Sequence, residues 1–313
     1  MIDTAVILAA GRGSRLKEVT AHRSKALAPI AGKPIIMRVI DSLTEAGIRR
    51  FLVVGSPRDE ELKALCSSFP EITFLTQEHP LGSADALKGV APFVPHTFLV
   101  CACDSLIPAH DIATLIAHHS ATSVATLSII EVAPEISLGA RSVVTMNGEL
   151  VTAIIEKPSP DERLSNLSSL PLYILTKNIF PEIARLTPSP RGEFELPEAF
   201  RGLLLEGGII RGICASARYD LTDQRDLLAL NELFLTKLSP SIQVADSVVV
   251  PPSSKLIAPV LIEEGASVGE NTTIGPLVYL ERNTCVKPGL RVTRSIVLRN
   301  ATVTTDCNET IIV

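Results

Sequence analysis

An aliphatic residue recurs at every sixth position between residues 244 and 298. Small, polar or glycine residues separate these positions, as in the hexapeptide that begins at Ile262. Neither the 3.6-residue period of a helix nor the two-residue period of a flat strand explains this pattern. A triangular β-solenoid does, because each flat side takes one inward aliphatic residue per hexapeptide and stacked coils share one core. The recurring positions are Val244, Val250, Leu256, Ile262, Val268, Ile274, Leu280, Val286, Val292 and Leu298.

Apolar, strand-like runs alternate with helical patterns in the first part of the chain. Such alternation predicts an α/β fold with a parallel or mostly parallel sheet that is covered on both faces. Ligands on such sheets bind at the carboxyl ends of strands, so we expect the loops after Leu8, Leu75 and Cys101 to converge on one crevice. The predicted strands are 4–8, 51–54, 72–75 and 98–101, and the predicted helices are 34–46, 60–66 and 112–118.

A β-rich segment follows, with predicted strands at 124–132, 141–146, 151–155 and 172–175. We expect this segment to pack as a lid or platform beside the crevice. The chain of 313 residues exceeds one typical domain. We therefore predict two domains, residues 1–236 and residues 237–313.

Composition and charge exclude several classes of function. A net charge of −5 and a pI near 5.8 give no basic surface for a nucleic acid polymer. The N-terminus runs directly into the first strand and no apolar run approaches the ~20 residues that span a bilayer, so we expect neither a signal peptide nor a membrane partner. The six cysteines show no Cys-x-x-C pair. We expect them to be small buried residues in a reducing cytoplasm, without a zinc site or a disulfide framework.

A tight glycine loop directly follows the first strand, in the stretch Leu8-Ala9-Ala10-Gly11-Arg12-Gly13-Ser14-Arg15-Leu16. Such a loop directs a row of backbone N–H groups into one concave space, which suits phosphate oxygens, although it is often only a turn. Arg15 and Lys25 would add positive charge there. The spacing excludes a dinucleotide fingerprint, which needs a glycine where Leu16 stands, and no Gly-Lys-Ser/Thr ending forms a Walker loop.

Together with the continuation Ser24-Lys25-Ala26-Leu27-Ala28-Pro29-Ile30-Ala31-Gly32-Lys33-Pro34, this loop closely resembles the signature of the sugar-1-phosphate nucleotidyltransferases, or nucleotide-sugar pyrophosphorylases. That signature runs Leu-Ala-Ala-Gly-x-Gly-Thr-Arg-Leu and then Lys-x-Leu-x-Pro-x-x-Gly-Lys-Pro. Ser14 stands for the usual threonine and keeps the hydroxyl. The resemblance covers residues 4–236 and implies a Rossmann-like mixed sheet that carries the activity.

The loop from Gln77 to Ala86 resembles the Gln-x-x-Pro-Leu-Gly-Thr-Ala-x-Ala segment of that family, in which Gln and Gly contact the nucleobase. Taken alone, it is also compatible with a Pro-Leu-Gly turn and a helix cap at Ser83. Glutamine here is most familiar in the uridylyl and thymidylyl branches, which favours UTP or dTTP. Asp104 matches the family aspartate that holds Mg²⁺, although Cys103 replaces the glycine that precedes it in the family. Alternatively, Asp104 caps the following helix.

Further motifs resemble the sugar half of the family site. Leu138-Gly139 and Ile155-Glu156-Lys157-Pro158 resemble Tyr-Gly and Val-x-Glu-Lys-Pro, which implies that Gly139 and Glu156 hold sugar hydroxyls and that Lys157 meets the sugar phosphate. The segment from Ser165 to Tyr173 resembles the Ser-Asn-Leu-x-Asn-Ala-Gly-Ile-Tyr motif of the family. Ser169 stands where the family commonly has Asn, and Pro171 replaces the family glycine. Because proline removes an N–H donor, these departures suggest an unusual sugar.

The motifs near residues 191 and 220 complete the resemblance. Arg191-Gly192-Glu193-Phe194-Glu195-Leu196 resembles Arg-Gly-Glu-Tyr-Glu-Ile, and Glu195 is either a sugar contact or part of a surface helix start. The run from Tyr219 to Leu228 resembles Trp-x-Asp-Val-Gly-Thr-Pro-x-Asp-Leu-Leu. Asp220 would be the second metal ligand, and the segment around Asp226 would cap the last helix of this part.

The hexapeptide region resembles the left-handed parallel β-helix that is often appended to these enzymes. None of the six histidines lies in it, so the general base of a β-helix acyltransferase is missing. We expect an assembly or regulatory role, with a homo-oligomer formed through the β-helix.

The resemblance implies a sugar-1-phosphate nucleotidyltransferase of EC class 2.7.7 that converts an NTP and a sugar 1-phosphate into an NDP-sugar and pyrophosphate. The alternatives are a non-catalytic regulatory or assembly paralogue and transfer to a non-sugar phosphate. The implied site comprises catalytic Arg15, Lys25 and Lys157; nucleotide-binding Leu8, Ala10, Gly11, Gly13, Gln77 and Gly82; sugar-binding Gly139, Glu156, Ser169 and Glu195; and Mg²⁺ ligands Asp104 and Asp220.

Overall fold

The computed structural model describes residues 2–11, 13–133 and 142–313. Contacts group the chain into two compact units, which are described separately below. The first unit comprises Met1–Gly11 and Arg38–Tyr219, and the second comprises Arg12–Met37 and Asp220–Val313. No helix in the described part of the chain combines the length and the apolar character that a membrane crossing requires.

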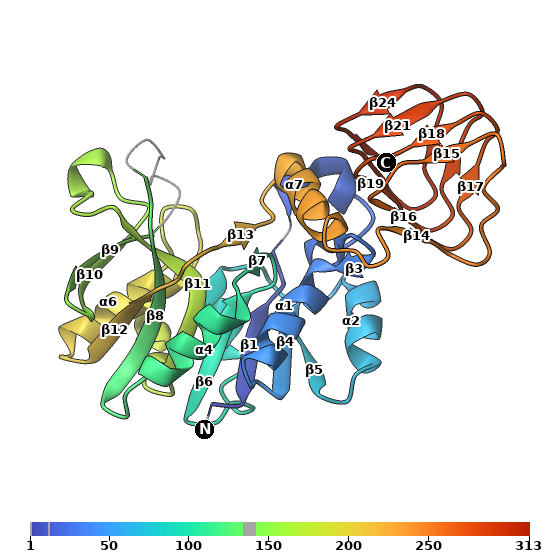
Figure 1. The fold of residues 1–313 in the computed structure, drawn as a ribbon. Helices are drawn as coiled ribbons and strands as arrows, with labels where there is room; N and C mark the ends of the chain where they lie inside the picture. Colours follow the sequence, from blue (N-terminus) through green and yellow to red (C-terminus); the bar gives the residue numbers. More distant parts are fainter. Residues whose placement is uncertain (1, 12, 134–141) are drawn as a thin grey trace. The chain divides into compact units, whose positions relative to one another are not determined.

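The first unit is built on a nine-stranded sheet. Strand β1 (Thr4–Leu8) lies between β4 (Arg50–Gly55) and β6 (Thr97–Ala102) and is parallel to both, and β5 (Ile72–Thr76) continues the parallel part beside β4. Leu8 lies opposite both Val54 and Ala102, so the carboxyl ends of these strands meet at one edge (Figure 1). The predicted parallel pairing of these strands is confirmed.

The β-rich middle of the chain extends this sheet and does not form a separate layer. Leu172 pairs with Cys101, so β11 joins β6 directly and antiparallel, and the order is β5-β4-β1-β6-β11-β8-β12-β10-β9. Strand β12 was not predicted, and it lies parallel to β8. The bounds of these strands are β8 (Ser123–Glu131), β9 (Ser142–Asn147), β10 (Leu150–Glu156), β11 (Leu167–Thr176) and β12 (Ile209–Cys214).

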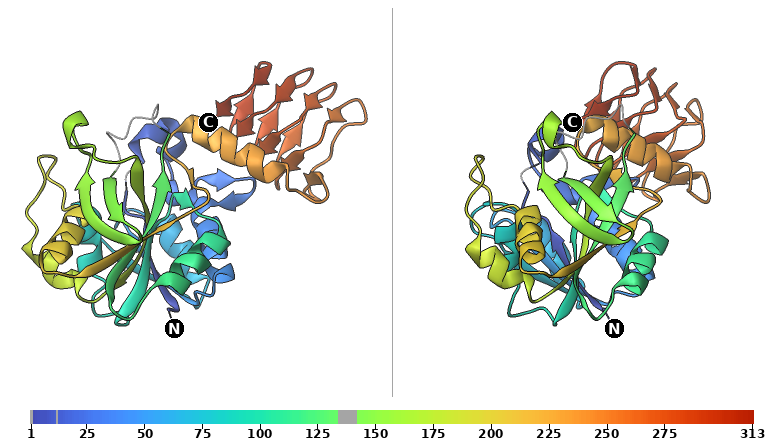
Figure 2. Two further views of the ribbon diagram at one scale, coloured as in Figure 1. Left: turned by 60° about the vertical axis from the view of Figure 1, so that its left-hand side comes forward. Right: turned by 90° about the vertical axis from the view of Figure 1, so that its left-hand side faces the viewer.

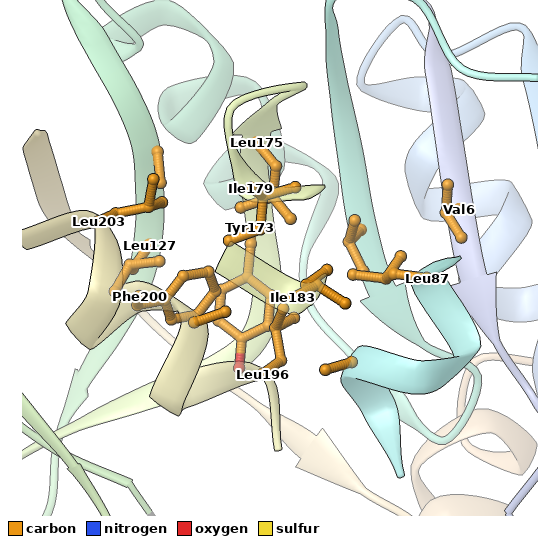
Figure 3. Close-up of a cluster of buried hydrophobic side chains, with 14 of the residues drawn as sticks. Val6, Leu87, Leu127, Tyr173, Leu175, Ile179, Ile183, Leu196, Phe200 and Leu203 are labelled. Atoms are coloured by element: carbon orange, nitrogen blue, oxygen red, sulfur yellow. The ribbon is translucent and has the colours of Figure 1, made fainter. Parts of the chain in front are cut away.

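Helices pack on the sheet because apolar residues recur on one side of each. On one face, a buried cluster joins α3, α5 and α6 to strands across the sheet (Figure 3). Within it the rings of Tyr173 and Phe200 meet edge to face, with their centroids 5.0 Å apart. The helices are α1 (Ile35–Glu45), α2 (Glu60–Ser67), α3 (Ser83–Lys88), α4 (Ala109–His118), α5 (Ile179–Arg185) and α6 (Leu196–Leu205). Cys66, Cys101 and Cys103 are buried as predicted, whereas Cys214 is exposed.

The second unit contains the predicted solenoid (Figure 2). Its short strands form three sheets, and the strands within each sheet are parallel. Residues 18 apart lie opposite one another, as Ile262 and Leu280 do. This stacking is consistent with the expected left-handed β-helix. The strands are β14 (Ile242–Val244), β15 (Lys255–Leu256), β16 (Val260–Ile262), β17 (Ser267–Val268), β18 (Thr273–Ile274), β19 (Val278–Leu280), β20 (Cys285–Val286), β21 (Arg291–Thr293), β22 (Ile296–Val297), β23 (Thr302–Val303), β24 (Cys307–Asn308) and β25 (Ile311–Ile312).

The solenoid core contains nine of the ten predicted inward residues, and Leu298 is the exception. Val297 takes the inward position instead, because Leu280 pairs with Val297 and this coil is one residue shorter than the one before it. The prediction for Leu298 was therefore wrong by one position.

The remaining part of the second unit packs on the solenoid. Helix α7 (Gln224–Leu235) contacts both β19 and the short hairpin of β2 (Pro29–Ile30) and β3 (Lys33–Pro34). Two 3₁₀ helices, η1 (Ser14–Thr20) and η2 (Lys25–Leu27), precede that hairpin. The glycine loop thus continues into a segment that shares a compact unit with the β-helix.

Candidate active site

The predicted nucleobase loop follows β5. The side-chain amide of Gln77 is buried and donates to the carbonyl of Gly82 at 3.2 Å and to the Asp85 carboxylate at 2.9 Å. Gly82 has φ +108° and ψ 175°, and a Cβ there would lie 2.5 Å from the Phe194 carbonyl oxygen. The structure therefore joins Gln77 to Gly82 and explains the glycine, since this conformation belongs almost solely to glycine. Helix α3 begins at Ser83 and its N-cap is Gly82, so the alternative cap at Ser83 is wrong.

The carboxyl edge of the sheet positions Leu8 and Asp104. The backbone N–H of Cys103 donates to the Leu8 carbonyl at 3.1 Å, which extends the pairing of β1 and β6 up to the aspartate. Asp104 is half-buried, and the cap of the next helix is Pro108, so the alternative role as a cap is wrong. Burial, reinforced by the charge of Asp104, raises the pKa of the Cys101 thiol above its usual range. A carboxylate held here is a suitable ligand for a hard cation.

Three of the predicted sugar-side residues, Glu156, Ser169 and Glu195, lie near Tyr173 or Arg191. Glu156 accepts a short hydrogen bond from Ser142, and its carboxylate lies 3.6 Å from the Lys157 ammonium. Burial raises the pKa of Tyr173 to about 12, and the charge of Glu156 adds to the effect. Gly139 lies outside the described residues.

Glu195 is buried at the N-cap of α6, so it is not part of an exposed helix start. Its carboxylate accepts hydrogen bonds from the guanidinium of Arg191 and, at 3.3 Å, from Ser189. The hydrogen bond to Glu195 raises the pKa of Arg191, and the charge of Glu156 contributes. Sequence reasoning assigned no role to Arg191, although its position four residues before Glu195 was a usable signal.

Ser169 is buried in β11 at the point where pairing with β8 becomes irregular. The register shifts between Ser169 and Tyr173, and the pairing of β11 with β6 starts at Leu172, directly after Pro171. The missing N–H of Pro171 fits this break in the ladder. The proline therefore shapes the strand next to a predicted sugar-binding residue.

In the second unit, the structure brings Gly13 and Lys25 together. Gly13 has φ +61°, and a Cβ there would lie 3.0 Å from the Lys25 Cβ. The Gly13 carbonyl accepts hydrogen bonds from the Leu16 N–H at 2.9 Å and from the Thr20 hydroxyl at 3.1 Å. Arg15 is exposed on the first turn of η1. Two cations and a left-handed glycine therefore share one short segment.

Gly11 and Ala10 complete the loop on the side of the first unit. The φ of Gly11 lies outside the left-handed range, and a Cβ there would meet no heavy atom of the described chain within 4 Å. Ala10 is half-buried. A glycine with no neighbour on this side of its Cα leaves room for a phosphate oxygen to approach the backbone.

Asp220 is half-buried just before α7. The helix itself is capped by Asp223, which accepts from the N–H groups of Arg225 and Asp226, while the Asp226 carboxylate accepts from the Thr222 N–H at 2.6 Å. The predicted cap around Asp226 is confirmed, and the cap leaves Asp220 outside the helix.

Asp104 and Asp220 are the carboxylates that were predicted to bind a metal ion. No group of three or more His, Cys, Asp or Glu residues suited to a metal ion occurs within residues 2–11, 13–133 and 142–313. Mg²⁺ is commonly bound by one or two carboxylates together with substrate phosphates rather than by a cage of protein ligands. Asp104 in the first unit and Asp220 in the second are each half-buried carboxylates.

Comparison with known proteins adds independent information. A family model described as nucleotidyl transferase matches residues 4–232. The bifunctional protein GlmU of Methanococcus maripaludis is 30% identical over 265 residues, which cover 84% of this chain and 61% of GlmU. A glucose-1-phosphate thymidylyltransferase of Streptomyces griseus is 29% identical over 97% of this chain and 83% of its own length. The chain spans about three fifths of the length of the first curated relatives it matches.

Solved structures support the same fold. A UDP-glucose pyrophosphorylase complexed with UDP-glucose superimposes with a TM-score of 0.67 at 20% identity, over 76% of this chain and all of the other. A UDP-glucose pyrophosphorylase from Acinetobacter baumanii gives a TM-score of 0.64 at 21% identity, over 76% of this chain and 94% of the other.

Proposed function

Because this chain belongs to the nucleotidyl transferase family, we propose that it transfers a nucleotidyl group from a nucleoside triphosphate to a sugar 1-phosphate. An oxygen of the sugar phosphate attacks the α-phosphorus, and the bond to the β,γ-pyrophosphate breaks, so the products are an NDP-sugar and pyrophosphate. The family match over residues 4–232 carries this proposal. We assign it to a catalytic domain of residues 1–236, followed by the β-helix of residues 237–313.

The first task of such an enzyme is to hold two anionic substrates in line. We assign the β- and γ-phosphates to the backbone of Gly11 and Gly13 and to Arg15, and the α-phosphate region to Lys25. The open space beside the Cα of Gly11 and the close approach of the Gly13 backbone to the Lys25 side chain support this assignment. Fixed N–H groups and cations stabilise the charge that develops on the transferred group and on the leaving pyrophosphate.

The nucleobase is assigned to Leu8, Ala10, Gln77 and Gly82. The hydrogen bond from the Gln77 amide to the Gly82 carbonyl supports a shared role, because it fixes the loop on which both residues lie. We favour UTP or dTTP. The names of the similar proteins, a thymidylyltransferase and UDP-glucose pyrophosphorylases, agree with a pyrimidine nucleotide.

The sugar phosphate is assigned to Lys157, and the sugar hydroxyls to Gly139, Glu156, Ser169 and Glu195. The ion pair of Lys157 with Glu156 and the hydrogen bond of Arg191 to Glu195 support a polar sugar site. Because Arg191 neutralises the Glu195 carboxylate, we expect it to orient that group toward a hydroxyl.

A divalent metal is the cofactor implied by the family, and we propose Mg²⁺ held by Asp104 and Asp220. When bound, it would neutralise phosphate charge and orient the triphosphate. The half-buried position of each carboxylate outside a helix supports this role.

The deciding experiment measures pyrophosphate release over a panel of NTPs and sugar 1-phosphates. We expect one pyrimidine NTP with one sugar 1-phosphate to be preferred, and Mg²⁺ to restore activity after treatment with EDTA. Asp104→Asn should lower kcat by at least about 100-fold and leave the circular dichroism spectrum unchanged. Asp246→Asn, an exposed carboxylate of the second unit, is the matched control and should retain full activity.

The panel also distinguishes the alternatives. Release of pyrophosphate only with a non-sugar phosphate would replace the acceptor that we propose. No release with any pair, although NTP still binds, would indicate a non-catalytic paralogue. We further propose that the protein is cytoplasmic and forms a homo-oligomer through the β-helix, which sedimentation velocity would test.

A further inference from the structure

Residues 12–37 carry the proposed phosphate-binding cations, yet they share a compact unit with the β-helix and α7. We propose that the β-helix positions this segment for the nucleoside triphosphate, and that Arg23 and Glu281 are the decisive positioning residues. This inference rests on the proposed function, since it assigns Lys25 and Arg15 to the triphosphate. It gives the C-terminal repeats a direct part in nucleotide binding.

The first anchor is a buried, forked ion pair. The two terminal nitrogens of Arg23 donate to the two carboxylate oxygens of Glu281, at 2.8 Å and 2.9 Å. The side chains are only 6% and 9% exposed. Glu281 also accepts from the backbone N–H of Arg299 at 2.8 Å, and Arg299 donates to the His22 carbonyl at 3.1 Å. A fork of this kind fixes direction as well as distance.

The second anchor is Asn231 of α7, which is 1% exposed. Its side-chain oxygen accepts from the Ala31 N–H at 2.7 Å, and its amide donates to the Pro29 carbonyl at 3.1 Å. The hairpin also lies tightly on the solenoid: Gly32 has φ +78°, and a Cβ there would lie 2.9 Å from the Leu261 side chain.

Lys25 lies between the two anchors, two residues after Arg23 and four before Pro29. Its Cβ in turn packs against Gly13. A third contact, from the Gln224 amide to the Glu18 carboxylate at 3.1 Å, ties η1 to α7. The segment that carries Lys25 and the glycine turn is therefore held on both sides of Lys25 by residues of 220–313. Groups that are fixed before the substrate arrives stabilise charge without reorganising, so loosening an anchor should weaken the contribution of Lys25.

The test is a double-mutant cycle with Arg23→Gln, Glu281→Gln and the double variant. Each single substitution leaves a charge buried without its partner, so it should disturb the segment more than the double substitution does. We expect each single variant to lower kcat/KM for the NTP on the order of 10- to 100-fold, with the KM for the sugar 1-phosphate unchanged. The double variant should recover part of that loss.

Hydrogen exchange supplies a readout that does not depend on catalysis. In both single variants, peptides covering residues 13–28 should exchange faster than in the wild type. The matched control is Arg294→Gln, which removes an exposed ion pair of the same unit. Arg294 lies 2.9 Å from Glu232, and both side chains are more than 40% exposed. Because exposed pairs contribute little, this control should leave exchange and kinetics unchanged.

If Glu281→Gln does not fold, Arg23→Lys keeps the charge but not the fork and should show a smaller shift in the same direction. Wild-type exchange and wild-type NTP kinetics in the variants would overturn the proposal. If the wild type itself releases no pyrophosphate with any substrate pair, the proposed function fails. The exchange data then decide alone whether Arg23 and Glu281 position the segment.

Discussion

Replacing Gly82 with alanine should destabilise the first unit and weaken nucleotide binding. The backbone at Gly82 adopts φ +108° and ψ 175°, a region that side chains with a Cβ rarely enter. The new methyl group would also lie 2.5 Å from the carbonyl oxygen and 2.9 Å from the nitrogen of Phe194. Both atoms belong to the backbone and are already used: Phe194 donates to Leu81 at 2.7 Å and accepts from Ala84 at 3.0 Å. The chain cannot relieve the clash by turning a side chain.

The magnitude follows from two contributions. The backbone strain costs about 1–3 kcal/mol, and overpacking against a fixed neighbour costs about 1–3 kcal/mol. We therefore expect Gly82→Ala to lose about 2–6 kcal/mol of unfolding free energy. Domains of this kind are stable by only about 5–15 kcal/mol, so the variant should have a clearly lower urea midpoint. Since Gln77 donates to the Gly82 carbonyl, the KM for the NTP should rise as well.

Urea unfolding followed by circular dichroism is the assay, with Gly89→Ala as the control. Gly89 has an ordinary φ of −68°, and a Cβ there would meet nothing within 4 Å. The control should be unchanged or more stable by about 0.4–1 kcal/mol. If Gly82→Ala unfolds at the wild-type midpoint, the close approach of Phe194 is not a constraint and this reasoning fails.

Two further predictions concern titrating groups. Burial raises the pKa of Cys66 to about 11 and raises that of Cys101 further, so at pH 8 iodoacetamide should label the exposed Cys214 first; early labelling of Cys101 in mass spectra of the native protein would contradict this. Burial lowers the pKa of His119 below 6.5, so the unfolded chain binds more protons than the folded one as the pH falls through that value. Unfolding free energy should therefore drop between pH 7 and pH 5, and His119→Asn should reduce the drop; an identical pH dependence in the variant would rule out His119 as its source.

Sequence reasoning was accurate where the signal is local. The run from Thr4 to Leu8 becomes a strand with those bounds, because its five residues are apolar or β-branched and lie between the charged Asp3 and the glycine loop. It failed where pairing is long-range. Nothing between residues 167 and 176 indicates that this strand would join β6, and that pairing makes the β-rich segment part of the main sheet. Val297 takes the inward position that was predicted for Leu298 for a related reason, because a period of six does not indicate where a coil becomes shorter.

For the candidate site, too, sequence reasoning found the residues to which the motifs assign a role and missed those to which they assign none. Motifs indicated which groups bear the chemistry, but Arg191 and Arg23, which hold such groups in position, carry no signature of their own. A signal for Arg23 did exist in the repeat. Glu263 and Glu281 follow inward residues that stack directly, Ile262 on Leu280, so the two carboxylates recur on one face. Burial, with a contribution from Glu281, raises the pKa of Glu263. Glu281 is buried one coil away from a second acid, and a buried carboxylate is stable only when it is paired or hydrogen-bonded. Arg23, in the segment of residues 12–37, supplies the cation that pairs with Glu281, so the repeat specifies where this segment attaches.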